Sequence, residues 1–161
     1  MPVFISHRTA DDTIAKNVAY RLYNIHGIQC YLDDIDQRLK GVTPQQLTKI
    51  LVEMVNKCTN LLAVVTKNTE GSWWVPYEIG VAKQAPRVIS SMTNISDANL
   101  PAYLMEWPRL RGDDAVDKYA RLYKAQQKLL VENVLEKRAS FSIAQTSVET
   151  FERQLKAQLG Q

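Results

Sequence analysis

Short apolar runs alternate with segments of helical periodicity along most of the chain. Four apolar runs bounded by polar or turn residues predict buried strands, at 3–6, 28–32, 61–65 and 87–92. The segments after the first three runs repeat apolar residues every three or four positions and predict helices, at about 9–26, 43–55 and 72–84. A short fifth strand is expected within 100–110, and two further helices are expected over about 113–138 and 146–159.

This alternation predicts the fold class. Strands and helices that alternate with short connections form a parallel sheet with helices on both of its faces. The run 61–65 is apolar throughout, as expected of a central parallel strand that is buried on both sides. With 161 residues, no internal repeat and no linker-like stretch, the chain is expected to form a single α/β domain of four to five strands with long C-terminal helices.

Three helix starts carry capping signals, and each predicts that a helix begins directly after a threonine. The strongest is Thr43, which is followed by Pro44 at the first helical position and by Gln46, the residue that closes a capping box. The other two boxes pair a threonine with an acidic residue three positions on: Thr9 with Asp12, and Thr146 with Glu149.

Composition and charge exclude several classes of function. No apolar run approaches the roughly 20 residues of a membrane span, and the N-terminus shows no leader pattern, so a cytoplasmic protein is expected. The net charge is only +3, from 20 basic and 17 acidic residues scattered along the chain, so nucleic-acid binding is not expected. Cys30 and Cys58 are expected to be small core residues rather than a disulfide or a metal pair.

Most catalytic motifs are absent from the sequence. The six glycines are dispersed, so the chain has no glycine-rich phosphate loop. Neither His7 nor His26 is near a Gly-x-Ser-x-Gly motif, and Asp34-x-Asp36 lacks the remaining ligands of a calcium loop. No bound cofactor and no metal are therefore expected.

Polar residues gather where the predicted strands end. Sites in parallel sheets lie outside the carboxyl ends of the strands. Those ends carry Ser6-His7-Arg8, Asp33-Asp34 and Thr66. The acidic segment that begins at Asp33 is either a contact loop over this edge or an ordinary solvated turn. The pair His7-Arg8 is either part of a site or only the entry to a helix.

The helix expected over 72–84 carries a carboxyl group among aromatic residues. Trp74, Tyr77, Glu78 and Val81 share one face of this helix by their spacing. Glutamate is rarely buried unless it is paired or functional. This face therefore predicts either a site built around Glu78, or packing of the aromatic residues with Glu78 reaching solvent at the edge.

Four segments match the motifs of one known family, in order and with suitable spacing. They are Phe4-Ile5-Ser6-His7-Arg8; Gly27-Ile28 through Tyr31-Leu32-Asp33 with Gly41; Ser72-x-Trp74-x-x-Tyr77-Glu78; and Leu100-Pro101 with Trp107-Pro108. Together they resemble the Toll/interleukin-1 receptor (TIR) domain family. The resemblance covers about residues 3–110 of the single expected domain and leaves about 111–161 as a C-terminal helical segment without a family motif.

The resemblance implies a flavodoxin-like fold and, as in many bacterial and plant members and one animal branch, cleavage of NAD+ at the nicotinamide–ribose bond. The catalytic glutamate of those enzymes follows the tryptophan of a Ser-x-Trp motif by four residues, which is the position of Glu78. The implied substrate-binding residues are Trp74 and Tyr77 at the nicotinamide end, Ser6, His7 and Arg8 at the first loop beside it, and Asp33 near the ribose side.

The resemblance also implies partners and alternatives. Stand-alone bacterial TIR enzymes of Thoeris-type antiphage systems convert NAD+ into ADP-ribose or a cyclic or modified form of it, and this product activates a separate effector. Self-association through TIR surfaces is implied as well. Animal adaptor TIR domains keep the fold but lack the glutamate, so a non-catalytic interaction module is the alternative. An enzyme like the nucleoside deoxyribosyltransferases, which also place a glutamate at strand ends, is a further alternative.

Overall fold

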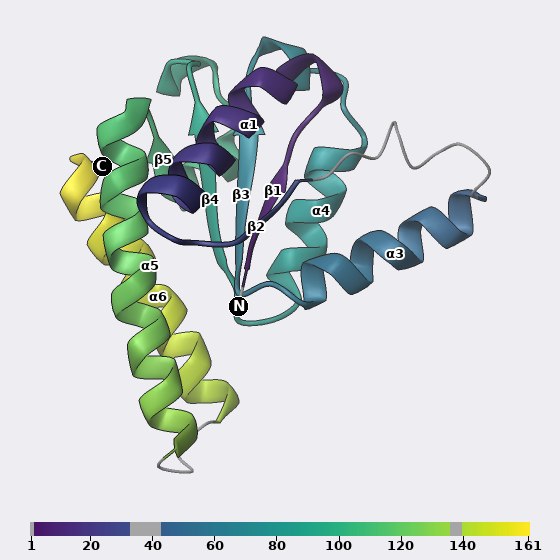
Figure 1. Cartoon of the computed structure of the whole chain (residues 1–161). Coiled ribbons are helices and arrows are strands. Elements are labelled where there is room, and N and C mark those ends of the chain that lie inside the picture. The colour runs from purple at the N-terminus through teal and green to yellow at the C-terminus, as the bar shows by residue number, and fades with distance from the viewer. Residues whose placement is uncertain (1, 33–42, 136–139) are drawn as a thin grey trace.

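The computed structural model describes residues 2–32, 43–135 and 140–161, which form one sheet with helices around it (Figure 1). The strands are β1 (Val3–Ser6), β2 (Cys30–Leu32), β3 (Asn60–Val65), β4 (Val88–Thr93) and β5 (Arg109–Leu110). The α-helices are α1 (Asp12–Tyr20), α3 (Pro44–Asn56), α4 (Trp74–Lys83), α5 (Gly112–Leu135) and α6 (Phe141–Leu159). Shorter helical segments are η1 (Thr9–Asp11), the π-helical η2 (Arg21–Ile25), η3 (Lys67–Thr69), η4 (Asp97–Asn99) and η5 (Ala102–Glu106).

The strands of the described chain are all parallel, in the order β2-β1-β3-β4-β5. This order confirms the predicted flavodoxin-like α/β fold. The chain moves from β1 to β2 in one direction and then from β3 through β5 in the other, so the strand order reverses between β1 and β3. In sheets of this kind, ligands bind at such a switch point, outside the carboxyl ends of the strands.

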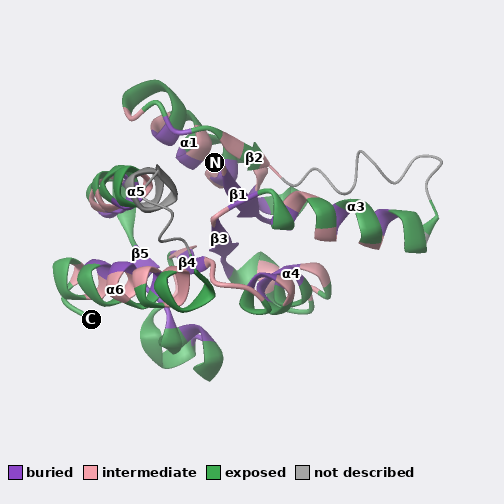
Figure 2. Ribbon diagram, turned by 90° about the horizontal axis from the view of Figure 1, so that it is seen from below, coloured by how far each residue is buried: buried purple, intermediate pink, exposed green. Residues whose placement is uncertain are grey.

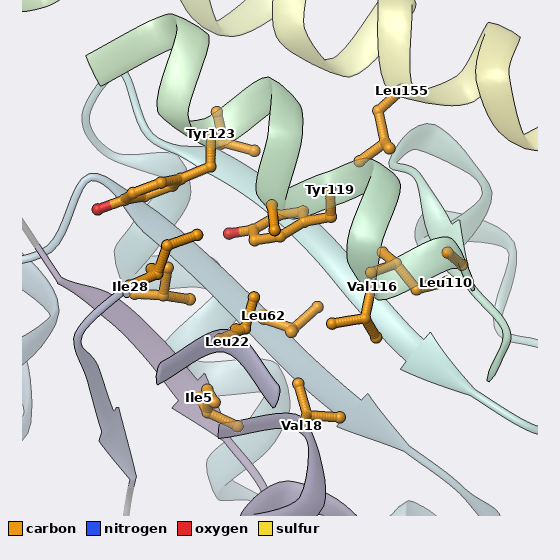
Figure 3. Packing of buried hydrophobic residues seen from close by; sticks show 14 of the residues in the cluster. Ile5, Val18, Leu22, Ile28, Leu62, Leu110, Val116, Tyr119, Tyr123 and Leu155 are labelled. Carbon is orange, nitrogen blue, oxygen red and sulfur yellow. The ribbon is translucent and has the colours of Figure 1, made fainter. Parts of the chain in front are cut away.

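Alternate residues of the sheet face two hydrophobic cores. Val3 and Ile5 of β1 pack with α1, α5 and α6 on one face, where Tyr119 has no exposed surface (Figure 3). Phe4 packs with α3, α4 and Trp107 on the other face. Because β1 is buried on both faces, its apolar run is continuous. Figure 2 shows the buried residues in the middle of the molecule and the exposed ones on the outer surfaces of the helices.

A charged cluster ties the end of the first helix to α5. Arg21, the first residue of η2, donates to both side-chain oxygens of Asp117 at 2.7 Å, and its remaining nitrogen donates to Asp113 at 3.0 Å. Nε2 of His26 also lies 2.7 Å from Asp117. The Arg21 guanidinium and the His26 ring lower the pKa of the Asp117 carboxyl group. These contacts hold α1 and η2 against α5 on one face of the sheet.

Helix α6 covers the edge of the sheet beside β4 and β5. Strand β5 is two residues long and does not reach Ile89 in β4, whose N–H donates to the Glu152 carboxyl group at 3.0 Å. At the outer edge of β5, the Gln161 side chain accepts from the Arg109 N–H at 3.0 Å and donates to the Arg109 carbonyl at 2.5 Å. Unpaired edge groups invite pairing with other chains, and here side chains from α6 and just after it satisfy them within the molecule.

The capping prediction at Thr43 is confirmed, and the one at Thr9 is wrong. Thr43 caps α3, and its box with Gln46 is complete in both directions. After Thr9, however, the chain first forms the 3-10 turn η1, and α1 begins only at Asp12 without a side-chain cap. The Asp12 side chain pairs with Lys16 one turn further on.

The capping prediction at Thr146 is also wrong, because α6 begins earlier than expected. Its cap is Ser140, whose hydroxyl accepts from the Ile143 N–H. Thr146 lies inside the helix and donates to the Ser142 carbonyl at 3.0 Å. Threonine is tolerated within helices when its hydroxyl makes this bond to the preceding turn, so a capping pattern alone does not fix a helix start.

The two C-terminal helices are long and amphipathic. Helix α5 spans 24 residues and α6 spans 19. Helix α6 buries Val148, Phe151 and Leu155 in the core that it shares with α5 and the sheet. Within the described ranges, no helix stays apolar over enough of its length to cross a lipid bilayer.

The two cysteines are free and pack with the cores, as predicted. Cys30 is half-buried in β2, and Cys58 is buried between α3 and β3. Burial raises the pKa of Cys30 to about 12 and that of Cys58 to about 11. Both thiols therefore stay protonated at neutral pH and behave as small apolar residues.

Replacing Asp117 with asparagine should weaken the attachment of η2 to α5. The variant loses the charge that Arg21 and His26 contact, so the free energy of unfolding at pH 7 should fall by about 1–3 kcal/mol. The folded state lowers the pKa of Asp117 below its usual 3.8. Its contribution is therefore present above about pH 5 and is lost as the pH falls toward the folded-state pKa. Urea denaturation of both proteins at pH 7 and at pH 3 measures this difference, and an equal difference at both pH values would contradict the assignment.

Candidate functional site

The carboxyl ends of β1 and β3 place two loops side by side. These strands pair along their length, β1 leads into η1, and β3 leads into η3 and then α4. The predicted gathering of strand-end residues is therefore confirmed for residues 6–8 and Thr66. Asp33, the residue expected near the ribose side, lies outside the described residues.

Glu78 is completely buried in α4. The helix packs on the sheet through Val75, Ile79 and Ala82, and Glu78 lies at the edge of this stripe. Trp74, one turn earlier, is half-buried and packs against the same core. The alternative in which Glu78 reaches solvent is therefore wrong. A glutamate buried in this way is usually paired or functional.

The two flanks of α4 face different surroundings. On one flank, Val75 and Pro76 line a cavity of about 870 Å³ together with η3, η4 and η5. A helix turns once every 3.6 residues, so Trp74 and Glu78 lie on the opposite flank. The strand order puts β1 on that side of α4, and α3 packs there as well, as Figure 1 shows. Glu78 thus lies on the flank of α4 that is nearer to β1.

The side chains of residues 6–8 point in three directions. By the two-residue period of a strand, Ser6 faces the core beneath α4, and it is fully buried. His7 is turned to the opposite face, where its Nε2 lies 3.5 Å from Asp12 of α1. Arg8 is exposed and donates to the Asn68 carbonyl in η3. The structure therefore brings Arg8 to the loop that leads into α4, and it places His7 against α1 rather than beside Glu78.

Trp74 and Tyr77 form an aromatic pair on α4. Their ring centroids lie 6.0 Å apart at an interplanar angle of 86°, an edge-to-face arrangement. Trp74 is half-buried, whereas Tyr77 is 38% exposed and Trp73 is 89% exposed. The burial pattern agrees with the choice of Trp74 as the tryptophan associated with Glu78. Aromatic surface therefore stays accessible to a ligand while the neighbouring carboxyl group is covered.

A buried polar network, which the sequence pattern does not reveal, joins the two loops. Asp11 of η1 is 2% exposed and accepts from the Thr66 hydroxyl at 2.8 and 2.9 Å through its two oxygens. It also accepts from the Asn68 side-chain amide at 2.7 Å. In the sequence, Asp11 is an ordinary first-turn acid. The only signal of the network is that Thr66 ends a buried strand.

This arrangement is suited to stabilising positive charge on a bound molecule. A carboxyl group held in a water-poor environment interacts with developing charge far more strongly than it would in water. Aromatic rings beside it offer a surface for a flat heterocycle. Among the residues that the structure describes, no group of three or more His, Cys, Asp or Glu side chains is placed to hold a metal ion.

Comparison with known protein families assigns the domain. A family model described as TIR domain matches residues 3–125, which is more than half of the chain and includes the whole region from β1 through α4. The chain therefore belongs to the TIR domain family. The match ends within α5, and α6 lies beyond it. A search of curated proteins found no matching relative.

Replacing Thr66 with valine should destabilise the fold more than replacing it with serine. Valine removes the hydroxyl and leaves the buried Asp11 side chain with only its bond to Asn68. The expected loss in the free energy of unfolding is about 1–3 kcal/mol. Serine keeps the hydroxyl, so its loss should be less than half as large. Urea denaturation of the three proteins measures both losses; a loss in the valine variant no larger than that in the serine variant would contradict the assignment to the hydroxyl.

Proposed function

We propose that this TIR domain is an enzyme that cleaves NAD+ at the bond between nicotinamide and ribose, with Glu78 as its catalytic residue. The observation that carries the proposal is the complete burial of Glu78 in α4 beside the half-buried Trp74. Burying a carboxyl group costs free energy of folding unless partners offset that cost, so glutamate is rarely buried unless it is paired or functional. An enzyme gains from such burial, because charge stabilisation is strongest where water is excluded.

The proposed reaction needs only one carboxylate. Glycoside hydrolysis usually requires a second one to protonate a poor leaving group. Nicotinamide in NAD+ is already a cationic pyridinium, so when the C1′–N bond breaks, the electron pair stays on nitrogen and the base leaves neutral. The ribose that remains resembles an oxocarbenium ion. In this proposal the carboxylate of Glu78 stabilises its positive charge.

The acceptor at C1′ then decides the product. Water adds to C1′ and loses a proton, which gives ADP-ribose. An atom of the same molecule gives a cyclic isomer of ADP-ribose, and a third molecule gives a conjugate. We propose that the product is a nucleotide signal in bacterial antiphage defence, read by a separate effector, and that self-association through TIR surfaces accompanies activity. Membership of the TIR family, whose domains commonly self-associate, supports the last of these points.

The other predicted site residues take different parts in this proposal. Trp74 and Tyr77 form the apolar wall against which the nicotinamide ring packs. Arg8 contacts the substrate from the loop after β1, and Asp33, which lies outside the described residues, is assigned to the ribose side. Ser6 faces the core beneath α4 and His7 lies against Asp12 of α1, so we assign both to the support of these loops rather than to direct contact. NAD+ is the substrate, and no cofactor is required.

Glu78→Gln should abolish nicotinamide release while keeping the volume of the buried side chain. The loss should be at least about 100-fold, the usual cost of removing a group that stabilises charge in the transition state. Glu53→Gln makes the same chemical change at an exposed position on α3 and should leave release unchanged. Each protein is incubated with NAD+ at high protein concentration, with and without lysate from phage-infected cells. Nicotinamide and the ribosyl product are quantified by liquid chromatography and mass spectrometry.

The outcomes separate an enzyme from an interaction module. Circular dichroism and thermal unfolding first establish that Glu78→Gln is folded. Release by the wild type and Glu53→Gln, but not by Glu78→Gln, supports the proposal, and the product mass shows whether water was added. Equal release by folded Glu78→Gln overturns the mechanism. No release by the wild type under either condition, together with self-association in sedimentation, identifies a non-catalytic module.

A further inference from the structure

Asp11 connects two loops that are far apart in the sequence. Its hydrogen-bond partners Thr66 and Asn68 lie 55 and 57 residues further along the chain. Both partner groups are neutral, a hydroxyl and an amide, and the aspartate between them is almost completely buried. Burial of a carboxyl group is unfavourable unless its oxygens are hydrogen-bonded, so the bonds from the Thr66 hydroxyl, shared between both oxygens, and from the Asn68 amide offset that cost. We refer to Asp11, Thr66 and Asn68 as the Asp11 clamp.

The clamp extends through η3 by way of the Thr66 hydroxyl. The same Oγ1 that donates to Asp11 accepts from the backbone N–H of Asn68 at 3.0 Å. The backbone N–H of Thr66 donates to Thr69 Oγ1 at 3.0 Å, and Thr69 donates to the Val64 carbonyl in β3 at 3.3 Å. Thr66, Asn68 and Thr69 therefore each take part in these hydrogen bonds, and Lys67 lies between them.

The fixed loop leads directly into the helix that carries Glu78. After η3 the chain reverses at Gly71, whose φ of +75° favours glycine. Ser72 follows, and its hydroxyl accepts from the Val75 N–H in the first turn of α4. The start of α4 is thus positioned by a short and hydrogen-bonded path from Thr66. A shift of Thr66 would move this start, and Glu78 with it.

Arg8 is attached to the same loop from the other side. Its guanidinium donates to the backbone carbonyl of Asn68, while the side-chain amide of Asn68 donates to Asp11. Arg8 and Asp11 lie in one loop after β1, and both contact Asn68 in the loop after β3. The exposed cation and the start of α4 are therefore held in a fixed relation across the switch point.

We propose that Asp11 is a positioning residue for the reaction proposed above, because the Asp11 clamp sets the spacing between Arg8 and Glu78. Both carboxylate oxygens of Asp11 already accept from Thr66 or Asn68, so in this proposal it acts through these two residues and not on the substrate. A misplacement of about 1 Å at a reacting centre can cost about 100-fold in rate. The kinetic consequence rests on the proposed function, whereas the clamp itself is a property of the fold.

Asp11→Ala should lower kcat by about 10- to 100-fold, with KM within about threefold of the wild type. Asp11→Asn keeps one oxygen that can accept from Thr66 or Asn68, and it should recover a large part of kcat. Asp114→Asn makes the same acid-to-amide change on an exposed turn of α5, where Asp114 pairs with Lys118, and should match the wild type. Rates of nicotinamide release are expressed per folded molecule, with the folded fraction taken from thermal unfolding.

The kinetic outcomes distinguish positioning from a merely structural role. A loss of kcat in folded Asp11→Ala with recovery in Asp11→Asn supports the proposal. If Asp11→Ala only lowers the melting temperature and each folded molecule keeps the wild-type kcat, the proposal is overturned. A rise in KM with unchanged kcat also overturns it, because that pattern indicates a role in binding substrate rather than in aligning the reacting groups.

Hydrogen–deuterium exchange tests the clamp without any use of NAD+. The backbone N–H of Thr69 donates to the Thr66 carbonyl at 3.0 Å, and the N–H of Ser72 donates to the Thr69 carbonyl at 2.9 Å. In Asp11→Ala these amides, with that of Asn68, should exchange at least about tenfold faster, while those of α5 stay unchanged. Unchanged exchange in this loop would show that Asp11 does not hold it. If the wild type releases no nicotinamide, the proposed function fails, and exchange alone decides whether the clamp exists.

Discussion

The position of every candidate functional group depends on the burial of β1. This strand is paired with β2 on one edge and with β3 on the other, and all of its residues are buried. Both faces of β1 must then be covered by helices. The next strand, β2, is added on one side of β1, and β3, β4 and β5 are added on the other side. That reversal of the strand order sets the loops after β1 and β3 next to each other. Arg8, Asp11, Thr66 and the path to Glu78 all lie where these loops meet.

Two acidic side chains at this edge of the sheet are buried, which is unusual for carboxyl groups. Glu78 has no exposed surface and Asp11 has 2%, although carboxyl groups in proteins are mostly exposed. Asp11 is accommodated by bonds from Thr66 and Asn68, so its burial joins two loops. The burial of Glu78 beside aromatic side chains of α4 has a different consequence, because it places a carboxyl group where water is scarce. In the proposed enzyme the two buried acids therefore have separate parts: Asp11 fixes the position of the loops, and Glu78 stabilises charge.

The C-terminal helices share a hydrophobic core with the part of the chain that the family model matches. The family match ends at residue 125, within α5, yet the core beneath α5 continues through α6. Helix α6 packs Phe151 and Leu155 into this core, and Glu152 accepts from a β4 N–H that strand β5 is too short to reach. Gln161 does the same for β5 by pairing with both backbone groups of Arg109. In this chain the edge groups beside β4 and β5 are thus satisfied from within the molecule.

The sequence by itself determined the order of strands and helices, the parallel sheet, the cap at Thr43 and the face of α4 that carries Glu78, because each depends on periodicity or on neighbours within one turn. It could not decide between a buried and an exposed Glu78, since burial depends on the elements packed against α4. It also could not show that His7 turns toward Asp12 of α1, or that Asp11 bonds to Thr66. Those contacts join residues from different elements, and only the tertiary structure brings them together. The false caps at Thr9 and Thr146 have a similar origin, because a capping pattern is local whereas the start of a helix is set by where the whole helix packs.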